Sequence, residues 1–167
     1  MKAAGLILAM ALALALQPTL ARFVVRGTVA VDLVLVVVVY VGLTSGPVTG
    51  LLSGTAAGLV QDALSSGVIG IGGLAKTVIG FLAGFVGTRF IVAHPIPRFV
   101  VFVAATIMHA AVFIGLYVLL NLRQFGAPYA AVGAQAIGNA VVGVVAFQLV
   151  EMVPGAVERR RAARGRR

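Results

Sequence analysis

Runs of apolar residues, each close to the length needed to cross a lipid bilayer, follow one another along almost the whole chain. A spanning helix needs about 20 predominantly apolar residues. Of all residues, 61% are hydrophobic and 10% are charged, whereas soluble domains are about 45–50% apolar and about 25% charged. The bilayer must therefore be the solvent for most of the chain, and 167 residues leave no room for a separate soluble domain.

The boundaries of these runs predict an all-α integral membrane protein with six transmembrane helices. The helical domain is expected over residues 1–153, with a basic tail over residues 154–167. The expected helices cover about residues 3–21, 29–43, 47–64, 69–91, 98–120 and 129–150. The second run is rich in valine, but an isolated strand cannot satisfy its backbone hydrogen bonds in lipid, so a helix is expected there.

Two alternatives to this arrangement stay open. The first run follows Lys2 and has the basic start and apolar core of a secretory signal peptide. A retained helix is favoured, because the core is long and no clear small-x-small cleavage motif precedes Arg22. A five-helix arrangement with the N-terminus outside the cell is the second alternative.

Basic residues indicate the orientation of the helices in the membrane. In the six-helix arrangement nine basic residues fall on the side of the two termini and three on the opposite side, which favours cytoplasmic termini. Six of the nine form the tail: Arg159, Arg160, Arg161, Arg164, Arg166 and Arg167. Beside a membrane, such a cluster indicates topology and attraction to anionic lipids. The net charge of +9 is therefore not interpreted as affinity for nucleic acid.

The residue inventory restricts chemistry. The chain has no Cys, two His and four acidic residues, so disulfides and cysteine metal sites are excluded. No nucleophile motif, phosphate loop or carboxylate pair occurs, and the fragment Gly70-Ile71-Gly72-Gly73 lacks the preceding strand of a dinucleotide site. We expect no enzyme, no metal and no cofactor.

Small residues recur every four positions in the third and fourth apolar runs. Residues four apart lie on one face of a helix, and small residues there let helix backbones approach closely in lipid. The glycines expected on these faces are Gly46, Gly50, Gly54, Gly58, Gly80 and Gly84. They serve either packing between the chain's own helices or docking of a partner's transmembrane helix, and the sequence leaves both open.

Two charged residues, Asp62 and Lys76, lie in these runs. Charges within transmembrane segments are costly and are usually paired or functional. Both are seven residues from position 69, so a hairpin places them at similar depth and predicts an ion pair. Gln61, beside Asp62, is assigned to the same polar site. Alternatively, Asp62 lies at the membrane interface and Lys76 extends outward.

A second set of polar residues lies on the last two apolar runs. Gln135 and Asn139 are four residues apart, and Thr106 and His109 on the preceding run are expected to join them. Amides of this kind tie membrane helices together by hydrogen bonds. We expect a structural hydrogen bond for His109 rather than a proton path. Asp32 is expected near the N-terminal end of its helix, where a carboxylate is favourable.

The stretch from Val31 to Gly84 resembles the rod shape-determining protein MreD family. The resemblance rests on Asp32 to Tyr40 with Gly42-Leu43, on Gly46-Pro47 with Gly50 and Gly54, and on the segments 58–67 and 74–84. The segment from Gly58 to Ser65, with Gln61-Asp62 inside it, is the most specific part. Val31 stands where relatives commonly have proline. The remaining runs match in length and layout only.

The resemblance implies a non-enzymatic, multi-pass protein of the bacterial cytoplasmic (inner) membrane. MreD proteins act in rod-shape determination and lateral peptidoglycan synthesis. Their implied partners are MreC, through its transmembrane helix, and the elongation complex with MreB, RodA and a penicillin-binding transpeptidase. The family is also similar in fold to the substrate-binding component of energy-coupling-factor transporters. The alternative function is therefore binding of a vitamin-like ligand, in a closed polar pocket with aromatic walls.

Overall fold

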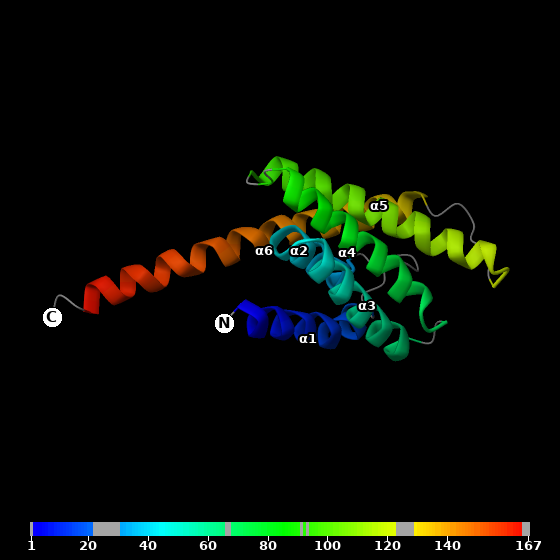
Figure 1. Cartoon of the computed structure of the whole chain (residues 1–167), viewed down its shortest axis with the longest axis horizontal. Coiled ribbons are helices and arrows are strands. Elements are labelled where there is room, and N and C mark those ends of the chain that lie inside the picture. The colour runs from blue at the N-terminus through cyan, green and yellow to red at the C-terminus, as the bar shows by residue number, and fades with distance from the viewer. Residues whose placement is uncertain are drawn as a thin grey trace.

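All regular secondary structure in the described part of the chain is α-helical (Figure 1). The computed structural model describes residues 2–21, 31–65, 68–90, 92, 94–122 and 129–164. These residues form α1 (Lys2–Ala21), α2 (Leu33–Ser45), α3 (Pro47–Leu64), α4 (Ile71–Arg89), α5 (Pro95–Leu119) and α6 (Tyr129–Arg164). The all-α prediction is confirmed, and the bounds of α3 coincide with those expected.

Three of these helices are long and apolar enough to cross a membrane. They are α4, α5 and the Tyr129–Met152 part of α6, while Ala4–Thr19 and Leu33–Ser45 are shorter apolar helices. The arrangement with six transmembrane spans therefore stays a prediction.

Local sequence explains where α2 ends and α3 begins. Gly46 has φ 88°, a left-handed value that costs a residue without Cβ little. Pro47 then occupies the first turn of α3, where its missing N–H leaves no hydrogen bond unmade. The chain therefore reverses over a single residue, and α3 begins directly against α2.

Helix α2 lies at the centre and contacts each of the other five helices. Seven of its residues are buried, and most of these are valine. A helix that is apolar on all sides is expected inside a bundle. The neighbouring core contains aromatic rings in contact, with the tilted rings of Tyr40 and Phe147 4.5 Å apart between centroids. Gly143 makes room for the ring of Phe102, which a Cβ there would approach to 2.5 Å.

Helix α6 is longer than the sequence predicted. It continues past Pro154 to Arg164 and extends away from the other helices towards the C-terminus (Figure 1). Proline removes one backbone donor and kinks or breaks many helices. The Ala, Glu and Arg residues that follow favour helix strongly, so α6 continues into the segment that was expected to form a separate tail.

Candidate functional site

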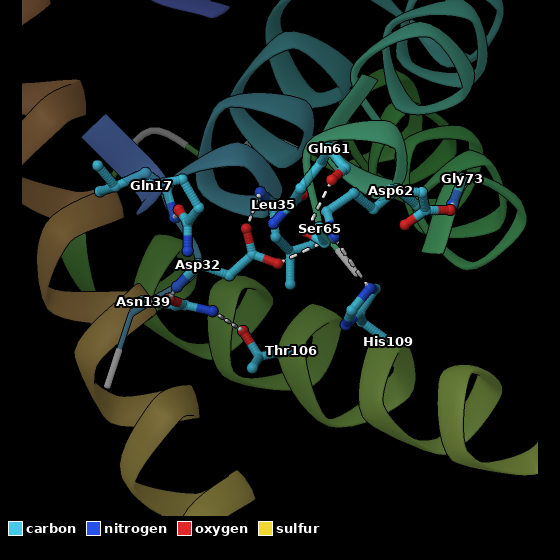
Figure 2. A network of polar contacts seen from close by, with 12 residues as sticks. Gln17, Asp32, Leu35, Gln61, Asp62, Ser65, Gly73, Thr106, His109 and Asn139 are labelled. Carbon is cyan, nitrogen blue, oxygen red and sulfur yellow. Dashed lines mark hydrogen bonds and ion pairs between the residues drawn. The ribbon is translucent and has the colours of Figure 1, made fainter. Parts of the chain in front are cut away.

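A network of buried and half-buried polar side chains joins five helices around the start of α2 (Figure 2). We call it the polar hub. Its members are Gln17 of α1, Asp32 before α2, Lys76 of α4, Thr106 and His109 of α5, and Asn139 of α6. Buried charges in a protein interior are costly unless they are paired and hydrogen-bonded, and the acidic and basic members of the hub, Asp32 and Lys76, form an ion pair.

Asp32 makes the central contacts of the polar hub. Its Oδ1 accepts a hydrogen bond of 3.0 Å from the Leu35 amide, which makes Asp32 the N-cap of α2. Its Oδ2 lies 2.9 Å from Lys76 Nζ, and both side chains are under 10% exposed. Its own amide donates to Asn139 Oδ1 at 2.8 Å. Asp32 therefore caps the start of α2 and ties it to α4 and α6. Its expected position at a helix start is confirmed.

The hub extends onto α5 through two separate contacts. Lys76 Nζ lies 3.3 Å from Nε2 of His109. Asn139 Nδ2 donates to Thr106 Oγ1 at 3.1 Å. The expected link between the polar residues of the last two helices is thus confirmed for Asn139 and Thr106, whereas His109 contacts Lys76. Gln135 lies half-buried one turn before Asn139.

Gln17 attaches α1 to the hub. Its side-chain nitrogen donates to the Val31 carbonyl at 3.2 Å, and its side-chain oxygen accepts from the Leu33 amide at 2.9 Å. The amide thus holds the backbone on both sides of Asp32 (Figure 2). Gln17 was not predicted as a site residue, although a Gln inside an otherwise apolar helix is a visible signal in the sequence.

The predicted pairing of Asp62 with Lys76 is wrong, because Lys76 pairs with Asp32. Asp62 Oδ2 accepts hydrogen bonds from the amides of Gly70 and Gly73, at 2.9 and 3.0 Å. These amides lie at the start of α4, where backbone donors lack partners within the helix. The capping role satisfies Asp62 without Lys76. The neighbouring Gln61 has a buried Oε1 without a hydrogen-bond partner in the described region.

The glycines of α3 and α4 pack against each other inside the chain. A Cβ on Gly50 would lie 2.1 Å from the Gly80 carbonyl oxygen, and one on Gly54 would lie 2.3 Å from the Lys76 carbonyl oxygen. A Cβ on Gly58 would meet Gly73 at 2.5 Å, and one on Gly84 would meet Pro47 at 2.4 Å. Of the two interpretations, the structure therefore assigns these glycines to packing between α3 and α4. Gly46 forms the turn between α2 and α3.

A third buried charged residue, Arg98, lies at the start of α5. Its guanidinium contacts both carboxylate oxygens of Glu151 on α6 and stands 4.3 Å from the centre of the Phe147 ring. Its Nε donates to the Val92 carbonyl at 3.1 Å. Among the nine basic residues assigned to the side of the termini, Arg98 was not predicted to have a partner. In the structure it joins the start of α5 to α6.

An open apolar groove of about 510 Å³ lies between α1 and α3, with α2 at its base. Its walls include Ile7 and Met10 of α1 and Leu52, Ser53 and Ala56 of α3. No aromatic side chain lines it, so it lacks the aromatic walls expected of a vitamin-binding pocket. The described residues also contain no group of three or more His, Asp or Glu placed to hold a metal ion.

Comparison with known proteins identifies a family. A model of the family described as rod shape-determining protein MreD matches residues 2–153, nearly the whole chain. Searches of curated proteins and of solved structures gave no match. The family match extends well beyond the 31–84 segment on which the resemblance rested and covers all six helices, at least in part. The chain belongs to the rod shape-determining protein MreD family.

Proposed function

We propose that this protein is a non-enzymatic component of the bacterial elongation machinery that binds the transmembrane helix of MreC in the groove between α1 and α3. Through MreC it supports rod-shape determination and lateral peptidoglycan synthesis, together with MreB, RodA and a penicillin-binding transpeptidase. Membership of the MreD family supports the role in cell shape. The groove between α1 and α3 is the observation that supports the proposed binding site.

The chemistry of the groove fits an apolar helix. Association of helices in lipid depends on close packing, and small side chains allow that approach. Ser53, Ala56 and Ala57 line the α3 side of the groove. The wall formed by α1 presents larger apolar residues, including Ile7, which is 70% exposed. The glycine faces cannot take this role, because α3 and α4 already fill them.

The orientation in the membrane is part of the proposal. Six spans with both termini in the cytoplasm place the C-terminal arginines beside the anionic inner leaflet of the cytoplasmic membrane. This places the tail on the side of the membrane where MreB filaments form.

Replacing Ala56 with Phe is expected to reduce capture of MreC at least about fivefold, since overpacking a close interface costs about 1–3 kcal/mol. Ala56 lines the groove and is exposed, so the added ring fills the groove without entering the core. Ala111→Phe, at an exposed alanine of α5, is the matched control. The measurement is co-purification with full-length MreC from membranes. Restoration of rods in cells lacking their own MreD is measured in parallel.

The control variant should bind MreC and restore rods as the unchanged chain does. Equal capture by a normally folded Ala56→Phe variant would refute the groove as the binding site. Failure of the unchanged chain to capture MreC would refute the proposed partner itself.

A further inference from the structure

We infer that the Asp32–Lys76 ion pair positions α1 and thereby sets the width of the groove between α1 and α3. The inference concerns regulation of the proposed binding site, and so rests on the proposed function for its biological meaning. Its structural content is a chain of three contacts that runs from one wall of the groove to the other.

The first contact holds α3 to α4. Gly50 and Gly80 bring the two backbones so close that a Cβ on either would lie 2.1 Å from the other's carbonyl oxygen. A hydrogen bond of 2.8 Å joins the Thr55 and Thr77 hydroxyls across the same interface. Close-packed interiors move as units, so the α3 wall of the groove moves together with α4.

The second contact joins α4 to the beginning of α2. Lys76 Nζ and Asp32 Oδ2 are 2.9 Å apart, with side-chain exposures of 4% and 9%. Separating two buried charges without new partners is costly. Other groups restrict each partner as well, since His109 contacts Lys76 and the Leu35 amide donates to Asp32. The ion pair therefore fixes the start of α2 relative to the α3–α4 unit.

The third contact joins the beginning of α2 to α1. Gln17 forms hydrogen bonds to the backbone of Val31 and Leu33, on either side of Asp32. Among the described side chains of α1, Gln17 alone is both polar and buried. The opposite end of α1 is more exposed, with Ile7 70% and Leu8 61% exposed. Helix α1 is thus attached near its C-terminal end and lines the groove with its other half.

These contacts make α1 a lever whose attachment point is set by Asp32 and Lys76. A change at the ion pair moves the backbone of residues 31–33, and Gln17 transmits that movement to α1. The N-terminal half of α1, which lines the groove, then changes its distance from α3. A bound partner shifts α1 from one position to another only if it contacts α1 differently in the two positions. A helix seated between α1 and α3 does so.

The test measures the distance between α1 and α3 directly. The chain contains no Cys, so Leu8→Cys and Val48→Cys provide the only two attachment sites for spin labels. Both positions are more than 60% exposed. Pulsed electron paramagnetic resonance in lipid nanodiscs gives the distance distribution without any partner. Lys76→Met and Gln17→Met are compared with Glu151→Gln, which alters the distant ion pair with Arg98.

Lys76→Met and Gln17→Met are each expected to broaden the distribution or shift its mean by about 2 Å, the size of helix displacements at interfaces. Glu151→Gln should leave it unchanged. An unchanged distribution in Gln17→Met would overturn the lever, and an unchanged one in folded Lys76→Met would overturn the role of the ion pair. If Lys76→Met does not fold, Asp32→Asn, which keeps a capping oxygen, replaces it with the same expected and contrary outcomes.

Failure of this inference and failure of the proposed function are distinguishable. The distances are measured without MreC, so they do not depend on whether MreC binds. Conversely, the Ala56→Phe substitution leaves the Asp32–Lys76 ion pair unchanged, so its effect on MreC capture does not depend on the ion pair. The distance measurements would detect control of the groove width by the ion pair even if MreC does not bind. The capture experiment would detect MreC binding even if the ion pair does not control the groove width.

Discussion

Replacing Lys76 with Met is expected to lower the free energy of unfolding by about 3–5 kcal/mol, because the Asp32 carboxylate then stays buried without its charged partner. Met keeps the length of the Lys side chain, so the change removes charge rather than volume. Reversible unfolding in mild detergent, followed by loss of helical circular dichroism, measures the effect. Few single changes in this chain should cost as much.

Two comparisons distinguish the effect of losing the ion pair from the effect of losing a positive charge. Arg89→Met removes a positive charge at the exposed end of α4, together with its contact to the Phe85 ring, and should change stability by no more than about 1 kcal/mol. Adding Asp32→Asn to Lys76→Met removes the uncompensated charge and should recover part of the loss. If Lys76→Met were as mild as Arg89→Met, the account of the polar hub would be wrong.

The second large effect is expected at the interface of α3 and α4. Replacing Gly50 with Ala places a Cβ 2.1 Å from the Gly80 carbonyl oxygen, a backbone atom that cannot move alone. The two helices must separate, which costs about 1–3 kcal/mol or more. The measurement is the same unfolding experiment.

Gly115→Ala is the matched control for this change. Gly115 lies within α5, and a Cβ there would meet nothing within 4 Å. Alanine favours helix over glycine by up to about 1 kcal/mol, so the control should be neutral or stabilising. Equal effects at Gly50 and Gly115 would show that the close contact between α3 and α4 does not limit stability.

The helical elements were largely predictable because they depend on local pattern. Apolar run length placed all six helices, and proline with glycine placed the boundary between α2 and α3. The glycine spacing correctly indicated close helix contact. It left open which surface the glycines meet, since a ridge of small residues looks alike whether it faces the same chain or a partner.

The polar hub was predictable only in part, because ion pairing depends on how helices pack. Asp62 and Lys76 are mirrored about the turn at residue 69, but backbone amides at the start of α4 compete for Asp62. Asp32 reaches Lys76 because α2 packs against α4. Nothing local in the sequence specifies that contact. Likewise, the groove lies between α1 and α3, whose relative position no sequence pattern indicates.

The most direct test of the account is photo-crosslinking from the groove. A benzophenone amino acid is placed at Leu52, which lines the groove and is 61% exposed, and separately at Val145, an exposed residue of α6. Irradiation of membranes that also contain MreC is expected to join Leu52 to the transmembrane helix of MreC and to leave Val145 without that product. Crosslinking of MreC from Val145 and not from Leu52 would contradict the account.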